Sequence, residues 1–330
     1  MSAFEDLKGW LATPWGWLII WIPVLAIFVA IALIGNTAGW APWEPNLDRM
    51  CFYREEQREL VRTGSFFLQV ANFWSNFAYL GVGLLILFRS GSFVGRGTGW
   101  AFVFLAFGSG YYHGSLTELG QFLDIAGIYM ALLALLFHGI IESFDLETSS
   151  DKTRNWFWFW MVCGMFAGFS KNLVPWHKSD YVAIFLGALI GILMIYWFFA
   201  ALLIGGGGSK DFSSLWGPFT LALISFAGAA FFKYGDMTDL DKKYQICKVV
   251  VQGKEVILSA LESCVPKQPP GYLVKADDSW AFGSESILQG HALWHIFSAF
   301  GMLCIFEFFT SLRRQSGSIR PWRSWYRTPE

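Results

Sequence analysis

The chain has 330 residues, of which 55% are hydrophobic and 19% aromatic, and its formal net charge is −1. Charged residues make up only 15% of it, well below the roughly 25% that is usual in soluble domains. A nearly neutral chain without a basic stripe lacks the electrostatic footprint of a nucleic-acid-binding protein. Apolar runs long enough to cross a bilayer, about 20 residues each, recur along the sequence. We therefore expect an all-α integral membrane protein that spans the bilayer several times.

Eight apolar runs have the length and composition of membrane-spanning helices. They lie near residues 15–35, 66–88, 97–115, 120–142, 155–172, 181–204, 214–232 and 288–311. The first begins well inside the chain and lacks a small-residue cleavage site, so we interpret it as a retained anchor rather than a signal peptide. The prediction is a bundle of seven transmembrane helices with one extra transmembrane helix at the N-terminus.

These runs divide the chain into three parts. Residues 1–47 form an N-terminal segment with the extra helix, residues 48–312 form the seven-helix domain, and residues 313–330 form a tail rich in arginine. A long loop, 233–287, interrupts the seven-helix domain just before its last helix. Because cytoplasmic segments of membrane proteins are enriched in Lys and Arg, the tail is predicted to be cytoplasmic. With eight spans the N-terminus is then cytoplasmic as well, and the long loop lies on the opposite face.

The five cysteines fit this topology. Cys163 and Cys304 lie in apolar runs, where we expect them to be packing residues. Cys51, Cys247 and Cys264 fall on the predicted non-cytoplasmic face, where disulfides form. Three thiols allow one bridge, and the sequence leaves open which pair forms it or whether all three stay reduced.

Polar residues stand at the ends of three predicted spans. The last span opens with His291 and His295, which lie one helical turn apart on one face. His113 stands at the end of the third span and Asp124 at the start of the fourth. Under the predicted topology all four lie at a similar depth, near the non-cytoplasmic face. Because an ionisable side chain inside a membrane is a functional-site candidate by default, we expect these residues to meet.

Three histidines and a carboxylate are the parts of a catalytic zinc site. Zinc binds neutral imidazole and, in catalytic sites, keeps three protein ligands and one open position. Asp124 is then a candidate acid/base for proton transfer. Ser109, one turn before His113, is a candidate donor to a developing oxyanion. Haem ligation and a purely structural role are the alternatives for the histidine pair.

For two further histidines and a polar stripe we favour structural roles. His138 and His177 have no partner pattern, and we expect them only to bond neighbouring structure. Asn72, Ser75 and Asn76 follow one another at i, i+3 and i+4. Residues of this kind commonly bond helix to helix, at about 0.6 kcal/mol each, and we favour that role here. The alternative is that they hydrogen-bond to the metal ligands and orient them.

Four sequence blocks, taken in order, resemble the signature segments of the alkaline ceramidase family. They are Ala71–Ala78 (ANFWSNFA), Gly108–His113 (GSGYYH), Gln121–Asp124 (QFLD) and Gln289–His295 (QGHALWH). The resemblance covers residues 48–312 apart from the long loop. It implies a membrane-embedded zinc hydrolase with seven core helices. The residues it implies are His113, His291 and His295 as zinc ligands, Asp124 as the acid/base, and Ser109 as support for the water or the oxyanion.

The resemblance also implies a substrate. Members of the family hydrolyse the amide of ceramide to a sphingoid base and a fatty acid, so the expected partner is a ceramide-like membrane lipid. The wider superfamily includes adiponectin-receptor-like proteins and lipid-remodelling hydrolases with a similar set of residues. A lipid receptor, or a hydrolase of another lipid bond, is therefore the alternative function.

The chain departs from the family pattern in three places. The N-terminal helix is extra, and the 233–287 loop is unusually long. This loop is either a lid over the site or a segment without a catalytic role that a disulfide crosslinks. Eukaryotic members bind calcium near the N-terminus. The candidate calcium ligands here are Asp48, Glu55, Glu56 and Asn72. Arginines are interleaved with these acids, so a solvated, charged entry to a helix is the alternative to a calcium site.

Overall fold

The computed structural model describes eight helices and a small sheet. The described residues are 67, 69–115, 117–144, 146–147, 150–169, 179–205, 210–243, 246–251, 254–259, 273–274 and 290–314. The predicted N-terminal span at 15–35 and the tail from residue 315 onward lie outside them.

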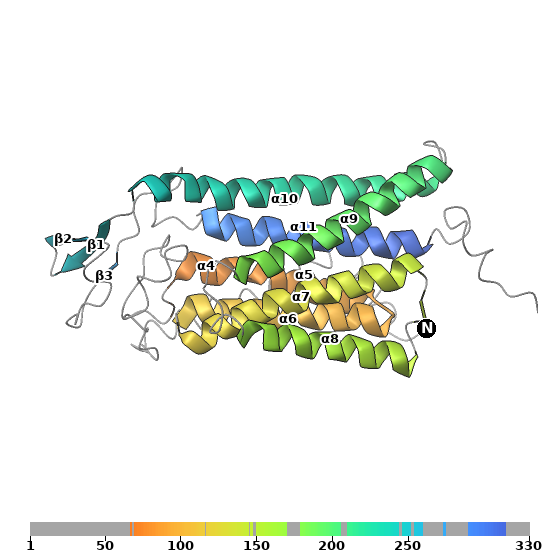
Figure 1. The fold of residues 1–330 in the computed structure, drawn as a ribbon, viewed down its shortest axis with the longest axis horizontal. Helices are drawn as coiled ribbons and strands as arrows, with labels where there is room; N and C mark the ends of the chain where they lie inside the picture. The colour runs from red at the N-terminus through yellow and green to blue at the C-terminus, as the bar shows by residue number, and fades with distance from the viewer. Residues whose placement is uncertain are drawn as a thin grey trace, which may run out of the picture.

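The described helices run side by side along the long axis of the molecule (Figure 1). Their bounds are α4 Val70–Ser75, α5 Phe77–Arg89, α6 Phe93–Ser115, α7 Glu118–Phe144, α8 Asp151–Phe169, α9 Ser179–Gly205, α10 Lys210–Lys243 and α11 Gly290–Arg314. Each of the seven apolar runs predicted between residues 66 and 311 is helical over most of its described residues, with α4 and α5 together covering the first of them. The predicted helical bundle is therefore confirmed for this part of the chain.

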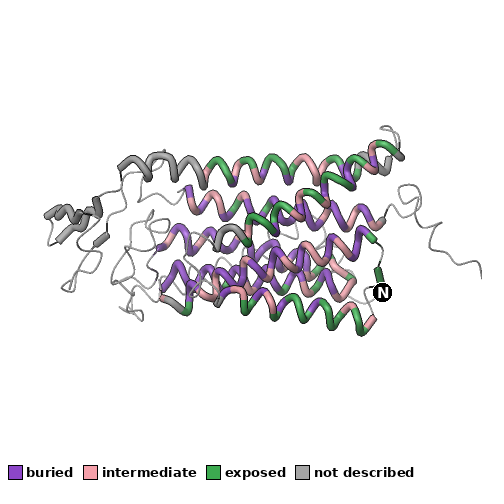
Figure 2. Tube along the Cα trace, in the orientation of Figure 1, coloured by how far each residue is buried: buried purple, intermediate pink, exposed green. Residues whose placement is uncertain are grey.

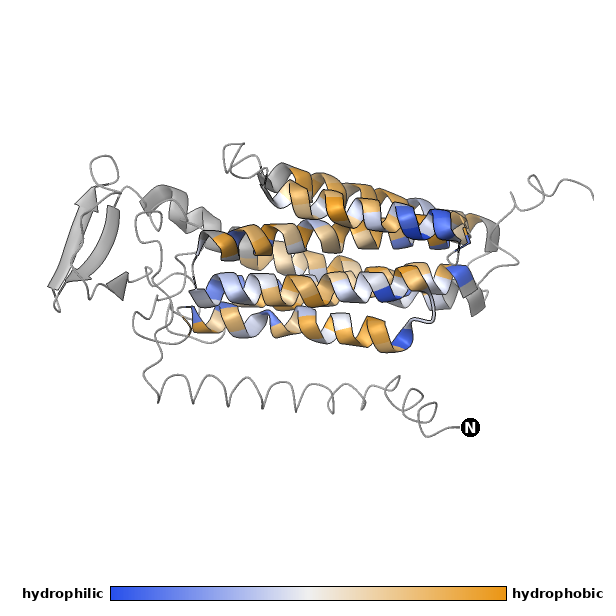
Figure 3. Cartoon of the chain, turned by 90° about the horizontal axis from the view of Figure 1, so that it is seen from below, coloured by the Kyte–Doolittle hydropathy of each residue, from blue (hydrophilic) through white to orange (hydrophobic). Residues whose placement is uncertain are grey.

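Within the described residues, five helical segments are long and apolar enough to cross a membrane. They are Val70–Arg89, Leu119–Phe144, Val182–Leu203, Ser214–Phe232 and Gly290–Arg313. Helices α6 and α8 lie alongside them (Figure 1) but are less apolar. Glycines and polar residues lower the hydropathy of α6, and charged residues with several tryptophans lower that of α8. The chain thus has the features of a multi-pass membrane protein. The hydropathy colouring of Figure 3 agrees with a membrane protein, because apolar residues predominate along the bundle.

Helices α4 and α5 are one segment with a local interruption at Asn76. The backbone of Asn76 remains in the right-handed helical region, with φ −66° and ψ −16°. The Ser75 hydroxyl and the Asn76 side-chain amide both donate to the Asn72 carbonyl oxygen, each at 2.8 Å. Side chains that bond the backbone in this way compete with the helical ladder, which explains the break inside an otherwise apolar span.

Helices α7 and α11 lie at the centre of the bundle. Helix α11 packs against α4, α5, α7, α9 and α10, and α7 packs against α6, α8, α9 and α11. Buried residues accordingly concentrate on the inner helices, whereas α8, α9 and α10 present many exposed residues (Figure 2). Exposed side chains on these outer helices are largely apolar, including Trp158, Phe166 and Leu203. A lipid-facing surface has this composition.

Glycines allow α6 and α7 to approach each other closely. A Cβ atom added to Gly108 would lie 2.6 Å from the carbonyl oxygen of Leu123 on α7. One added to Gly120 or to Gly127 of α7 would lie 2.8 or 2.7 Å from an α6 Cα atom. Small residues at such crossings let membrane helices pack backbone to backbone. The crossing brings the chain around Ser109 against the chain around Asp124.

The span predicted at 214–232 matches the membrane-spanning part of α10, Ser214–Phe232, but the 233–287 segment beyond it is only partly a loop. Helix α10 continues to Lys243 and then gives way to three strands, β1 Ile246–Val251, β2 Lys254–Ser259 and β3 Leu273–Val274. The strands form an antiparallel sheet in the order β2-β1-β3. The apolar run at 214–232 marked only the part of α10 suited to lipid, and a helix does not have to end where its apolar run ends.

Candidate metal centre

Three histidines come together at the end of the bundle where α6 ends and α11 begins. We call His113, His291 and His295 the histidine cluster. One ligand atom from each residue lies within 4.8 Å of the other two. His113 and His295 are buried, with exposed fractions of 1% and 2%, and His291 is partly exposed. The cluster can hold a metal ion, and the predicted convergence of the three histidines is confirmed.

His113 is fixed from α4 at two points. The Gln69 side-chain oxygen Oε1 lies 2.7 Å from His113 Nδ1. The Gln69 backbone N–H also donates to the His113 carbonyl oxygen at 3.0 Å. Gln69 is the residue just before α4 and is 1% exposed. The start of α4 therefore holds both the backbone and the ring of His113.

His295 is fixed from α4 as well. Its Nδ1 atom lies 2.7 Å from the Ser75 hydroxyl oxygen. One turn further along, Tyr79 of α5 and Ser298 of α11 share a hydrogen bond of 2.6 Å. The Tyr79 ring also contacts the His295 ring edge-on, with centroids 5.8 Å apart. A polar seam of two hydrogen bonds thus joins the α4–α5 segment to α11 beside the histidine cluster.

Ser109 and Asp124 lie on neighbouring helices near the cluster. Ser109 is 1% exposed and stands one turn before His113 on α6. Asp124, on α7, is partly buried. The backbones of the two helices meet here, because a Cβ on Gly108 would lie 3.3 Å from the Asp124 backbone nitrogen. Asp124 is not in the group of ligand atoms that the described histidines form.

Several predicted features lie outside the described residues. Of the candidate calcium ligands, Asp48, Glu55 and Glu56 lie outside, whereas Asn72 is buried in α4 with an exposed fraction of 0%. His177 and two of the three cysteines predicted to form a disulfide, Cys51 and Cys264, also lie outside. Cys163 and Cys304 are free cysteines within helices, as expected for packing residues.

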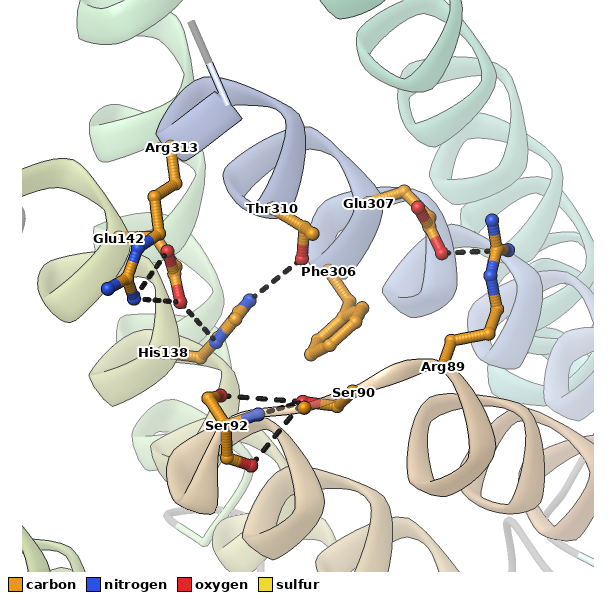
Figure 4. A pocket seen from close by; sticks show the side chains of 10 residues that line it. Arg89, Ser90, Ser92, His138, Glu142, Phe306, Glu307, Thr310 and Arg313 are labelled. Atoms are coloured by element: carbon orange, nitrogen blue, oxygen red, sulfur yellow. Dashed lines mark hydrogen bonds and ion pairs between the residues drawn. The ribbon is translucent and has the colours of Figure 1, made fainter. Parts of the chain in front are cut away.

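His138 lies at the other end of the bundle, in a polar cavity (Figure 4). The cavity has a volume of about 240 Å³. Its lining residues are Arg89, Ser90, Gly91, Ser92, His138, Glu142, Phe306, Glu307, Thr310 and Arg313. His138 Nε2 lies 3.2 Å from the Thr310 hydroxyl oxygen on α11. The ring stacks on Phe306 of the same helix, with centroids 4.3 Å apart. His138 thus bonds neighbouring structure, as predicted. It also has a partner one turn along its own helix that was not predicted from the sequence, because its Nδ1 atom lies 3.8 Å from Glu142 Oε1.

Two arginine–glutamate ion pairs line the same cavity, and we call their four residues the ion-pair cluster. Arg89 of α5 pairs with Glu307 of α11 at 2.9 Å. Arg313 of α11 contacts both carboxylate oxygens of Glu142 of α7, at 3.2 and 3.3 Å. These pairs tie the C-terminal end of α11 to α5 and α7 (Figure 4).

Gln69 was not predicted as a partner of the histidines, and Ser75 was assigned mainly to helix contacts. The signal available in the sequence was the polar stripe of Asn72, Ser75 and Asn76 inside an apolar run. Its contact with the histidine cluster depends on the rotation of α4 about its axis, which one sequence does not specify. In the structure Ser75 contacts a ring nitrogen of His295, which is the contact that the alternative interpretation of the stripe requires.

Comparison with known proteins adds no further assignment. A scan against models of protein families gave no match, and a search of curated proteins found no match either.

Proposed function

We propose that the protein is a membrane-embedded, zinc-dependent amidohydrolase that cleaves the N-acyl bond of ceramide or of a related long-chain lipid amide. The observation that carries this proposal is the histidine cluster, in which two helices far apart in sequence bring three imidazoles to one point. Helix α11, which carries two of the three histidines, and the neighbouring α4–α5 and α7 segments are long and apolar enough to lie in a membrane. A metal site in that position has lipids as its nearest substrates.

The residues present fit zinc. Three imidazole nitrogens and an open position are a common ligand set of catalytic zinc. The Nδ1 atoms of His113 and His295 are hydrogen-bonded to Gln69 and Ser75, as is usual for metal-binding histidines. When bound, zinc supplies a water of lowered pKa and polarises a carbonyl oxygen.

The chain's own residues have distinct roles in the proposal. Asp124 accepts a proton from the attacking water and gives it to the leaving nitrogen. Ser109 donates a hydrogen bond to the oxygen that becomes negative as the amide carbonyl is attacked. The apolar interior of the seven-helix bundle excludes bulk water and holds the acyl chain. Amide cleavage then yields a carboxylic acid and a free amine, here a fatty acid and a sphingoid base.

Release of product from a ceramide, with the metal counted in the same sample, tests the proposal. Purified protein is incubated with a fluorescent ceramide, and bound zinc is measured by elemental analysis. We expect one zinc per chain and steady release of fatty acid and sphingoid base, both lost in His291→Ala. Bound zinc without release would reject ceramide and favour another lipid bond or a receptor role. Absence of any bound metal would reject the site itself.

The role of Asp124 has its own test. Asp124→Asn keeps the size of the side chain but removes its basic oxygen, so turnover should fall by about 100-fold to 10,000-fold. Zinc content should stay at the wild-type level, because Asp124 is outside the histidine cluster. Asp151→Asn is a matched control, since Asp151 is an exposed residue at the start of α8. Unchanged turnover in Asp124→Asn would rule out the proposed acid/base.

A further inference from the structure

Gln69 and Ser75 approach the histidine cluster from the same short element, α4. We infer that they are positioning residues that hold His113 and His295 in the Nδ1–H tautomer, so that each presents Nε2 to the metal. The inference deepens the proposed function and rests on it, because it concerns how the same cluster binds its ion.

The direction of the Ser75 hydrogen bond follows from its second partner. The Ser75 hydroxyl donates its single proton to the Asn72 carbonyl oxygen at 2.8 Å. Its oxygen can then only accept from His295 Nδ1, which lies 2.7 Å away. A neutral imidazole carries one N–H, so with the proton on Nδ1 the lone pair for a metal is on Nε2.

Gln69 acts on His113 in the same sense. Its carbonyl oxygen Oε1, an acceptor, is the atom that lies 2.7 Å from His113 Nδ1. The backbone hydrogen bond from Gln69 N to the His113 carbonyl oxygen fixes the two residues relative to each other. The acceptor is therefore held in place before any metal arrives, and Nε2 of His113 is again the ligand atom.

Both contacts should strengthen metal binding in two ways. They fix the orientation of each ring, which lowers the entropy lost when the ion binds. They also draw the Nδ1 proton toward an oxygen, which makes Nε2 a more basic ligand. Because Gln69 and Ser75 flank a single short helix, α4 couples a ligand on α6 to a ligand on α11.

The competing explanation is that Ser75 only joins two helices. Figure 1 shows α4 and α5 lying along α11, and the Tyr79–Ser298 hydrogen bond joins the same helices one turn away. Ser298 donates to the Trp294 carbonyl oxygen at 2.7 Å, so Tyr79 is its donor. This bond joins the same helices as the Ser75 contact but does not touch an imidazole nitrogen. Ser298→Ala is therefore the matched control for Ser75→Ala.

The first test measures zinc affinity of the purified full-length protein by competition with a chelator. We expect Ser75→Ala to weaken binding by about 10-fold to 100-fold, Ser75→Thr to restore most of the loss, and Ser298→Ala to leave affinity within about twofold. Equal losses in Ser75→Ala and Ser298→Ala would overturn the inference in favour of helix joining. A wild-type protein that binds no zinc would instead contradict the proposed function.

The second test changes the acceptor on His113. Gln69→Leu removes it and should weaken zinc binding by about 10-fold to 100-fold. Gln69→Glu supplies a stronger acceptor and should bind zinc at least as tightly as the wild type. With cobalt(II) as a spectroscopic probe, the visible absorption bands should change in Gln69→Leu and Ser75→Ala but not in Ser298→Ala. Weakened binding in Gln69→Glu that equals the loss in Gln69→Leu would overturn the assigned tautomer of His113.

Discussion

Helix α11 connects two polar clusters of different character, one at each end of the bundle. At its N-terminal end, His291 and His295 meet His113 in a group that contains no acidic residue among those described. At its C-terminal end, Glu307 and Arg313 each contact an opposite charge on another helix. Both clusters bring together residues that are far apart in the sequence, so proximity alone does not distinguish them.

What distinguishes the two ends is whether the polar groups satisfy one another. An arginine and a glutamate in contact compensate each other's charge, and the ion-pair cluster does this twice. Three imidazoles gain little from one another, but they gain much from a cation placed between them. We therefore interpret the ion-pair cluster as an anchor of α11 and the histidine cluster as the site of chemistry.

The largest effect is expected when one histidine is removed from each end of the bundle in turn. His295→Ala removes a ligand and should abolish zinc binding and reduce lipid hydrolysis by roughly 1,000-fold or more, since catalysis then lacks an activated water. His138→Ala removes an equally buried imidazole from the other end and should leave zinc content unchanged. Elemental analysis and the ceramide assay measure both effects. Loss of zinc in His138→Ala would show that the two ends are not independent.

The next largest effect concerns the stability of the folded protein and is expected from the ion-pair cluster. Glu142 is buried, with an exposed fraction of 3%. Glu142→Ala removes the carboxylate that the Arg313 side chain contacts. Breaking a buried pair costs about 3–5 kcal/mol; we expect about 3 kcal/mol here, because the Arg313 side chain is 37% exposed. Thermal unfolding in detergent measures the loss, and zinc content should not change.

Arg89 and Glu307 provide the control for that measurement. The Glu307 side chain is 22% exposed, against 4% for Glu142, and ion pairs in contact with water contribute about 0–1 kcal/mol. Glu307→Gln should therefore lower the unfolding temperature much less than Glu142→Ala does. Equal losses would mean that burial does not determine the strength of the anchor.

A smaller effect is expected at the α6–α7 crossing beside the histidine cluster. Gly108→Ala places a Cβ 2.6 Å from the Leu123 carbonyl oxygen, so the two backbones have to move apart. Overpacking of this kind costs about 1–3 kcal/mol, and it shifts Ser109 relative to Asp124, so turnover should fall as well. Gly110→Ala is the matched control, because its nearest heavy atom would be 3.6 Å away. Unfolding temperature and turnover should both stay near wild type in the control.

The sequence predicted the parts of this molecule that depend on hydrophobic periodicity and helix order. Apolar runs located each described helix of the bundle, and alternation of helix direction placed His113 beside His291 and His295. It did not predict the partners of those histidines, since Gln69 and Ser75 reach them through the rotation of α4. It also did not predict that α10 continues to Lys243, because a helix that leaves the apolar region keeps its backbone hydrogen bonds without needing an apolar sequence.

The smallest expected effect tests whether a hydrogen bond to a histidine matters equally at both ends. Thr310→Val removes the hydroxyl that contacts His138 Nε2 at 3.2 Å, while the side chain keeps nearly the same shape. Hydrogen bonds between membrane helices contribute about 0.6 kcal/mol on average, so the unfolding temperature should fall only slightly. Zinc affinity should not change, in contrast to the loss expected for Ser75→Ala. Each of the two substitutions removes one hydroxyl group that contacts one imidazole. A difference in zinc affinity between them would therefore come from the cluster to which that imidazole belongs.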